Sequence, residues 1–182
     1  NIDNPMYRTL YTLARKAGVS QISSFGSLRE ADCRLLDVKL KPTSSDITAE
    51  IYGKKLNYSI GAPGYHLVTN SLAVLCSLYA VGADIDVGVT ALTGFEGLAG
   101  RGKQHSIDIG AGTFELIDES YNASPASMAA AIEVLAKKQP IGRGRKIAVL
   151  GDMLELGENA SARHAALVEP LIQGVYIKYF SF

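Results

Sequence analysis

The first half of the chain alternates between helical and extended patterns of hydrophobic residues. An amphipathic run from Met6 to Ala17, closed by Gly18, predicts a helix, and residues 19–25 predict a short strand. Three runs with a period of two follow. Because alternation places one face in the core and the other in solvent, these runs predict an antiparallel meander. Their apolar positions are Leu36, Val38 and Leu40, then Ile47, Ala49 and Ile51, then Leu56, Tyr58 and Ile60.

The period then changes to that of a helix. From Tyr65, apolar residues recur at three- and four-residue steps until Gly82, and a second helix is expected over residues 86–92. A cluster of glycines comes next, and this change in composition predicts a domain boundary, with residues 1–99 in one domain and 100–182 in the other. The clustered glycines are Gly94, Gly97, Gly100 and Gly102.

Beyond the glycines, strand and helix patterns alternate, as in an α/β domain. The order strand–helix–strand–helix–strand predicts right-handed crossovers and one parallel sheet. The expected strands are residues 114–117, 146–150 and 175–180, and the expected helices are 125–138 and 162–172. Three parallel strands make an incomplete sheet, so we expect a piece of a longer protein. We also expect self-association through the apolar strand 175–180, whose outer edge would be unpaired.

Composition narrows the functional classes. Hydrophobic residues make up 47% of the chain and charged residues 20%, as in soluble globular proteins. The 18 basic residues are balanced by 18 acidic ones, which argues against a nucleic-acid partner. The longest apolar stretch, residues 67–82, is too short to cross a membrane, and the polar start resembles no signal peptide. Cys33 and Cys76 lack metal or redox spacing, so we expect buried free thiols and a cytoplasmic location.

Residues 97–104 nearly spell a P-loop. A P-loop needs a final hydroxyl, a strand before it and a helix after it, so that backbone amides converge on phosphates. Here Gln104 replaces the hydroxyl, a helical pattern precedes and an alternating pattern follows. We therefore expect a flexible glycine-rich connector and no P-loop.

The three histidines, His66, His105 and His164, share no metal-ligand spacing, so no metal site is expected. His66 and Asn70 lie in the first turns of the apolar helix that begins at Tyr65. An inward-facing Asn70 must find donors and acceptors, and an adenine edge offers both. A helix-capping role for Asn70 is the equally good alternative.

The strongest local signal for a binding site is residues 118–125, which place two carboxylates, a phenol and an amide after a strand and before a helix. Open α/β sheets bind ligands at that position. Ser124 as N-cap and Pro125 as the first helical residue explain part of the segment structurally. A second polar loop, residues 151–157, follows strand 146–150 and is expected at the same sheet edge.

Four segments, in this order, resemble motifs of the Mur ligase family, and the resemblance runs over essentially the whole chain. The last two resemble the member that adds D-alanyl-D-alanine more than its siblings. The segments are residues 64–73 (G-x-H-x-x-x-N-x-L-A), Gly100-Arg101-Gly102 (the arginine loop between central and C-terminal domains), 118–128 (D-D-S-Y-N-A-N-P-x-S-M) and 149–157 (V-x-G-D-M-x-E-L-G).

The resemblance implies a fold and an activity. Residues 1–99 would be the second half of a P-loop-type, ATP-binding central domain with its antiparallel β meander. Residues 100–182 would be part of a Rossmann-like, parallel α/β domain that binds the amino substrate. The implied activity is an ATP-dependent ligase that joins D-alanyl-D-alanine to UDP-N-acetylmuramoyl-tripeptide through an acyl phosphate. The implied cofactors are ATP and Mg²⁺.

Roles for five residues are likewise implied by the resemblance alone. Asn70 would contact adenine, Arg101 would contact the ATP phosphates, and Glu119 would hold the ribose hydroxyls. Tyr121 and Asn122 would face the substrate side of the cleft. No catalytic residue or metal ligand is assigned to this chain.

The sequence also departs from the family pattern. The family's P-loop and its magnesium-holding residues do not occur in it, so the chain by itself is expected to be inactive. Glu119 stands where Asp is usual, and Ser124 replaces the second Asn of the usual pair. Two alternatives stay open: another Mur or folyl-polyglutamate ligase, and a non-catalytic nucleotide-binding remnant.

Overall fold

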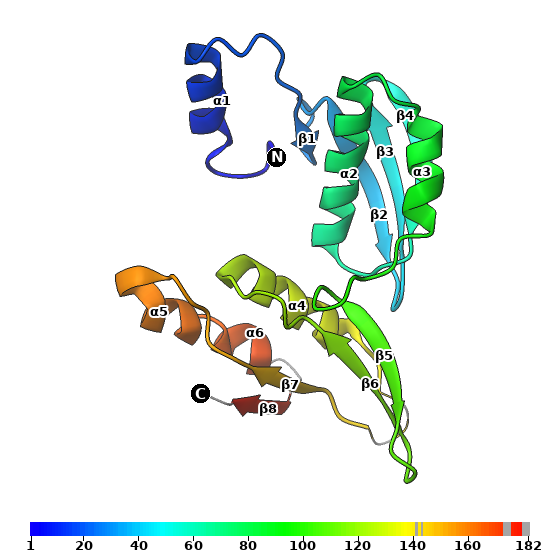
Figure 1. Ribbon diagram of the computed structural model, residues 1–182, viewed down its shortest axis with the longest axis vertical. Coiled ribbons are helices and arrows are strands. Elements are labelled where there is room, and N and C mark those ends of the chain that lie inside the picture. Colours follow the sequence, from blue (N-terminus) through cyan, green and yellow to red (C-terminus); the bar gives the residue numbers. More distant parts are fainter. Residues whose placement is uncertain (141, 143, 173–175, 180–182) are drawn as a thin grey trace. The chain divides into compact units, whose positions relative to one another are not determined.

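The chain folds into two compact units, Asn1–Phe95 and Glu96–Phe182, in a computed structural model that describes residues 1–140, 142, 144–172 and 176–179. Figure 1 shows both units in the colours of the sequence. The sequence analysis places the boundary a few residues later, between residues 99 and 100.

The first unit is built on a four-stranded sheet with the order β1-β2-β3-β4. β2 pairs antiparallel with β3, and β3 pairs antiparallel with β4, which confirms the predicted meander. Alternate residues of β3 are buried, as its period of two predicts. The strands are β1 (Phe25–Gly26), β2 (Cys33–Leu40), β3 (Ser45–Ile51) and β4 (Lys54–Ile60).

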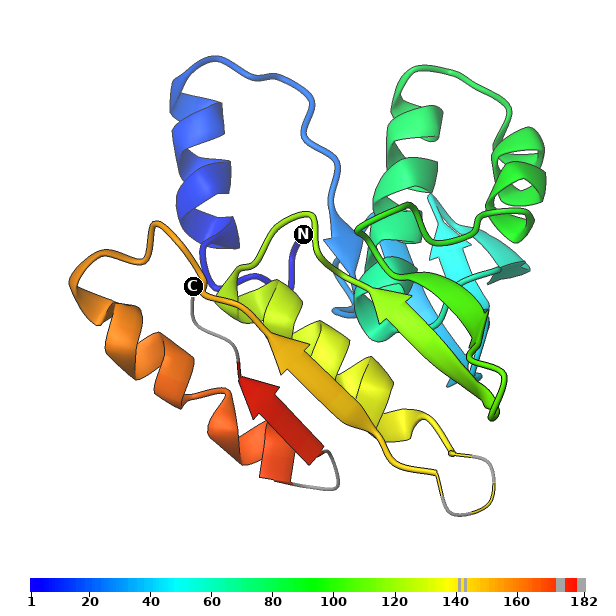
Figure 2. The ribbon, with the colours of Figure 1, turned by 60° about the horizontal axis from the view of Figure 1, so that its bottom comes forward.

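The three helices predicted for this unit are present. They are α1 (Tyr7–Lys16), α2 (Tyr65–Ala80) and α3 (Ile85–Thr93). Helix α1 has no buried residue, whereas α2 and α3 pack on the sheet, as Figures 1 and 2 show. The core between them includes Val68, Leu72 and Leu75 of α2, each 0% exposed.

The strand predicted over residues 19–25 is mostly wrong, since only Phe25 joins β1. The physical reason is a side chain that competes with strand pairing. The Asp32 carboxylate accepts hydrogen bonds from the backbone N–H and the hydroxyl of Ser24, both at 2.7 Å. The segment is therefore held as a loop against the start of β2.

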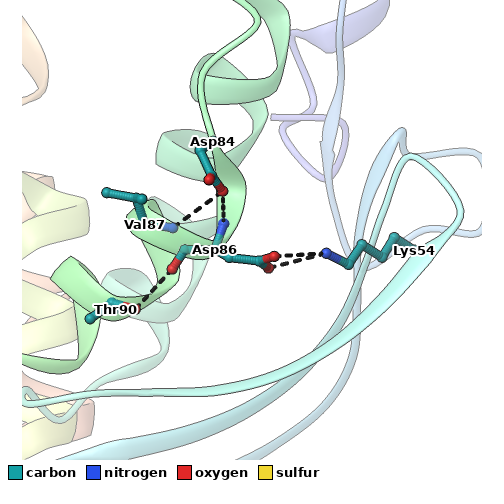
Figure 3. Close-up of polar contacts among 5 residues, drawn as sticks. All are labelled: Lys54, Asp84, Asp86, Val87 and Thr90. Atoms are coloured by element: carbon teal, nitrogen blue, oxygen red, sulfur yellow. Dashed lines mark hydrogen bonds and ion pairs between the residues drawn. The ribbon is translucent and has the colours of Figure 1, made fainter.

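Acidic residues fix the start of α3 (Figure 3). The Asp84 carboxylate accepts hydrogen bonds from the N–H groups of Asp86 (2.8 Å) and Val87 (3.4 Å), as an N-cap does. The Asp86 carboxylate pairs with Lys54 of β4 at 3.1 Å, and the Asp86 carbonyl accepts from Thr90 at 2.9 Å. The ion pair is exposed, so it contributes little to the stability of the fold.

The second unit holds two small sheets. β5 (Lys103–Asp108) pairs antiparallel with β6 (Thr113–Asp118), and β7 (Ile147–Leu150) pairs parallel with β8 (Tyr176–Tyr179). The single three-stranded parallel sheet expected from the sequence is therefore wrong for β6, which pairs with β5 and not with β7 within the described residues. A tight turn causes this: Ile109 N–H donates to the Gly112 carbonyl at 2.9 Å, and Gly110 has φ +76°.

Helices connect and cover these strands. α4 (Pro125–Lys137) begins at Ser124, whose hydroxyl caps the Ser127 N–H, which confirms the predicted cap. The helix predicted over residues 162–172 is two helices, preceded by a short 3₁₀ turn. Pro170 explains the break, because it lacks the N–H that a continuous helix would bond to the carbonyl of Ala166. The elements are the turn Gly157–Asn159, α5 (Ala160–Ala165) and α6 (Val168–Ile172).

β7 and β8 are parallel with α5 and α6 between them in sequence, as the crossover prediction requires. Residues 175 and 180 and the side chains of 176–179 lie outside the described residues, so self-association through this segment stays a prediction. None of the helices in the described part of the chain is long and apolar enough to cross a membrane.

Candidate nucleotide and substrate site

Two loops of the second unit are joined by hydrogen bonds around Asp118. We call residues 97–102 the arginine loop and residues 118–122 the acidic turn. The Asp118 carboxylate accepts from the Gly100 N–H at 2.9 Å and from the Ser120 hydroxyl at 2.6 Å. The Asp118 carbonyl accepts from the Gly102 N–H at 2.8 Å. The arginine loop is therefore fixed to the end of β6.

The arginine loop approaches the acidic turn so closely that a side chain would not fit at Gly100. The Tyr121 N–H donates to the Gly100 carbonyl at 3.1 Å. Gly100 has φ +70°, and a Cβ built on it would lie 2.8 Å from the Cβ of Tyr121. Both the left-handed backbone and the close contact require glycine here.

This geometry also bears on whether residues 97–104 form a P-loop. Lys103 begins strand β5, so no helix follows the arginine loop, in agreement with the prediction that it is not a P-loop. The sequence indicated a flexible connector. The structure shows a turn closed by the Arg101 N–H, which donates to the Leu98 carbonyl at 2.8 Å, in addition to the bonds to Asp118 and Tyr121.

Arg101 lies over the ring of Tyr121, with its guanidinium carbon 4.3 Å from the ring centroid. Such a cation–π contact orients the guanidinium without neutralising its charge. Tyr121 is 68% exposed, and Arg101 makes no ion pair with any described residue. A positive, oriented group is thus available to an anion from solution.

The two carboxylates of the acidic turn differ in their electrostatics. The pKa of Asp118 is lowered, first by the Ser120 hydroxyl and then by the N–H groups of Gly100 and Ser120. The pKa of Glu119 is raised, mainly by desolvation and then by the charge of Asp118. The environment therefore favours the ionised form of the Asp118 carboxyl and disfavours that of the Glu119 carboxyl.

Glu119 lies beside the backbone of the arginine loop, since its Oε1 is 3.2 Å from where a Cβ on Gly102 would stand. Its carboxylate forms neither an ion pair nor a hydrogen bond within the described part of the chain. Asn122 is exposed, and its side-chain oxygen accepts from the Ala123 N–H at 2.9 Å. Arg101, Glu119 and Tyr121 are thus brought together, with Asn122 next to them in the chain.

The second polar loop, residues 151–157, is organised by a histidine. The Met153 N–H donates to His164 Nε2 at 2.9 Å, and His164 Nδ1 lies 2.8 Å from the Ala160 carbonyl. Nε2 is then the acceptor nitrogen and Nδ1 carries the proton. Asp152 Oδ1 is 4.0 Å from Nε2. Sequence reasoning set His164 aside for lack of metal spacing and so missed this role.

The two polar loops do not lie at one edge of one sheet, as the sequence analysis expected, because β6 and β7 belong to different sheets. They meet through the core instead. Met153 is 3% exposed and belongs to the hydrophobic cluster against which Ala123 and Met128 pack. The signal that could have shown this is that each polar segment contains or adjoins an apolar residue, Met153 in one and Ala123 and Met128 beside the other.

Asn70 belongs to the first unit. It is exposed on α2, so the inward-facing orientation considered from the sequence is wrong. The capping alternative is wrong as well, because Asn70 lies inside the helix and the N-cap is Gly64. Its contact with adenine stays a prediction.

No group of three or more His, Cys, Asp or Glu side chains suited to a metal ion occurs among the residues that the structure describes. No chemical step is assigned to these residues through Mg²⁺.

Comparisons with known proteins agree on one family. Residues 108–178 match the family model described as Mur ligase, glutamate ligase domain. The UDP-N-acetylmuramoyl-tripeptide--D-alanyl-D-alanine ligase of Rickettsia prowazekii is 28% identical over 98% of this chain and 40% of its own length. The ligase of the same name from Bacillus subtilis is 30% identical over 92% of this chain and 34% of its own length.

A solved structure agrees as well. The MurF ligase of Thermotoga maritima in complex with ADP superposes with a TM-score of 0.75 and 26% identity, over 93% of this chain and 38% of that one. The chain thus spans roughly two fifths or less of the length of these relatives. Motifs, fold and relatives together show that the chain is similar to Mur ligases over most of its length, and its residues 108–178 match the model of that family.

Proposed function

We propose that this chain is part of an ATP-dependent ligase that joins D-alanyl-D-alanine to UDP-N-acetylmuramoyl-tripeptide in peptidoglycan precursor synthesis. The observation that carries the proposal is the linked pair of loops around Asp118. These loops carry the Arg101 guanidinium and the Glu119 carboxylate, neither of which forms an ion pair with a described residue, in segments that resemble motifs of this family. The relatives of that name and the related structure with ADP support it. The proposal carries with it a cytoplasmic location.

The side chains of Arg101, Glu119 and Asn70 have donors and acceptors suited to the parts of a nucleotide. In the proposed enzyme ATP supplies the phosphoryl group that activates the tripeptide's carboxylate. Arg101 would bind the phosphates, because its rigid fork of N–H donors matches phosphate oxygens and Tyr121 already orients it. Glu119 would accept hydrogen bonds from the ribose hydroxyls, and Asn70 would contact adenine.

The amino substrate is proposed to bind beside the acidic turn. Tyr121 is 68% exposed and would face the substrate side of the cleft together with Asn122. The proposed domain roles follow: residues 1–99 belong to the ATP-binding part, and residues 100–182 to the part that binds D-alanyl-D-alanine.

The decisive experiment measures phosphate release by the full-length protein that carries this sequence, given ATP, Mg²⁺ and UDP-N-acetylmuramoyl-tripeptide. Release that requires D-alanyl-D-alanine, with the pentapeptide product identified by mass, is the expected result. Phosphate release that instead requires glutamate or diaminopimelate with their own acceptors, or a folate, would assign the chain to a sibling ligase. Nucleotide binding without turnover on any of them would show a non-catalytic remnant.

A further inference from the structure

The two cysteines of the chain meet in the core of the first unit. Cys33 opens β2 and Cys76 lies in α2, and they are 0% and 4% exposed. Both are free thiols, as the sequence analysis predicted. The fold adds what their separation in sequence conceals, because both residues lie against the Ser24 carbonyl in one hydrophobic cluster. That carbonyl accepts from the Cys33 N–H at 2.9 Å and from the Cys76 thiol at 3.9 Å.

Tyr52 connects this thiol pair to the surface. It occupies the β3–β4 turn with φ 46°, a left-handed conformation that is rare for a bulky residue. Its hydroxyl bonds to the hydroxyl of Ser23 and lies 4.0 Å from Cys76 Sγ, while its ring stacks on Tyr79 at 3.7 Å. Tyr52 is itself partly exposed, so one side chain that contacts Cys76 reaches solvent.

The thiols are electronically unequal. The hydrogen bond from Cys33 lowers the pKa of Cys76, against the effect of burial, and the Tyr52 hydroxyl lowers it further. The same hydrogen bond and burial raise the pKa of Cys33. Cys76 therefore has the greater thiolate character and Cys33 is placed to act second.

We propose that Cys33 and Cys76 are a redox-sensitive pair that a small hydroperoxide converts reversibly into an intramolecular disulfide. The Cys76 thiolate attacks the peroxide, its S–O bond forms as the O–O bond breaks, and the leaving oxygen takes a proton to become an alcohol or water. The Cys33 sulfur then attacks the sulfenic sulfur, the S–S bond forms and water leaves. Two thiols are oxidised and one peroxide is reduced.

The disulfide would covalently link α2 to β2. The first turns of α2 carry Asn70, so the oxidation state of the pair acts on the helix that holds a proposed nucleotide contact. The simpler alternative is that both thiols are inert packing groups, as buried cysteines usually are. The two readings differ in what peroxide does to the folded protein.

The test treats the folded chain with hydrogen peroxide, denatures it, and counts free thiols by alkylation and intact mass. Because the chain has two cysteines, the expected loss of both labels together, with loss of two hydrogens, is unambiguous. A linked peptide containing Cys33 and Cys76 should appear in a non-reducing digest and disappear with dithiothreitol. Two alkylated thiols after full oxidation of an exposed model thiol would overturn the proposal, and so would disulfides formed only between chains.

Single substitutions test separately the oxidation of Cys76 and the attack by Cys33. Cys33→Ser should stop at a sulfenic acid on Cys76, which dimedone traps, whereas Cys76→Ser should trap little. Tyr52→Phe keeps the ring but removes the hydroxyl contact and should slow disulfide formation severalfold. If a serine variant does not fold, the mass change of the unaltered chain still decides the matter. Dimedone labelling confined to Cys33 would contradict the assigned order of attack.

Discussion

At the scale of single residues, the two carboxylates of the acidic turn should respond to pH in opposite directions. The folded-state pKa of Asp118 is lowered from 3.8, so its contribution to stability is present above that value and is lost as the pH falls through the lower folded pKa. Asp118→Asn should therefore be less stable than the unaltered chain near neutral pH, and the difference should shrink in acid. Thermal unfolding followed from about pH 7 to about pH 2.5 measures this.

Glu119→Gln is the matched control. Because the folded pKa of Glu119 is raised from 4.5, the native state resists ionisation, and its stability decreases as the pH rises through the window above 4.5. The Gln variant should gain stability relative to the unaltered chain over that window. Parallel pH profiles for the two variants would mean that the hydrogen bonds to Asp118 do not govern its ionisation.

Arg101 and Lys103 test the proposed phosphate contact. They are near neighbours with the same charge, but only Arg101 is oriented by Tyr121, at 4.3 Å. In the full-length enzyme, Arg101→Ala should reduce kcat/KM roughly a hundredfold, about 3 kcal/mol, since one contact to a developing charge is lost. Lys103→Ala should change it little. Equal losses would place the contact elsewhere.

The sequence showed which residue types could form a site but not what holds them. Arg101, Glu119 and Tyr121 could be proposed from motifs, and the structure brings them together. Asp118 appeared as one of two similar carboxylates, although its hydrogen bonds to Gly100 and Ser120 make it the anchor. The bond to Gly100 joins segments separated by a hairpin, and a local pattern does not encode it.

At the scale of elements, the arginine loop depends on Gly100. Gly100→Ala should destabilise the second unit and weaken nucleotide binding, because the new Cβ would lie 2.8 Å from the Cβ of Tyr121. Gly110→Ala is the matched control, since its φ of +76° carries the same left-handed strain but nothing lies within 4 Å of its Cβ. Gly100→Ala should cost clearly more than the ~1–2 kcal/mol typical of the left-handed strain alone. Equal shifts in denaturant midpoint would remove the steric argument.

His164 should hold the loop after β7, residues 151–157, through its hydrogen bond with the Met153 N–H. His164→Ala removes the acceptor of the Met153 N–H and should cost about 1–2 kcal/mol. Hydrogen exchange at the Met153 amide should accelerate. Arg163→Ala, at the exposed position before it, is the control and should leave that amide protected. Unchanged protection in His164→Ala would show that the loop is held by the burial of Met153 alone.

Strand and helix types could be predicted wherever a period was long and regular, as for α2 and the β2–β3–β4 meander. Partners could not. β6 was predicted to belong to a parallel sheet, but the turn at Gly110–Gly112 returns the chain so that β6 pairs antiparallel with β5. Pro170 was visible in the sequence and should have divided the predicted helix 162–172.

At the scale of the whole molecule, the chain should unfold in two steps, because each unit has a hydrophobic cluster of its own. The first contains Leu75, 0% exposed, and the second contains Ile132, 3% exposed. Truncating either to Ala should cost about 3 kcal/mol, in that unit alone. In scanning calorimetry, Leu75→Ala should lower one transition and Ile132→Ala the other. Among the described residues, the first unit buries more large side chains completely, so it should give the upper transition. A single transition that both variants shift equally would show that the units fold as one.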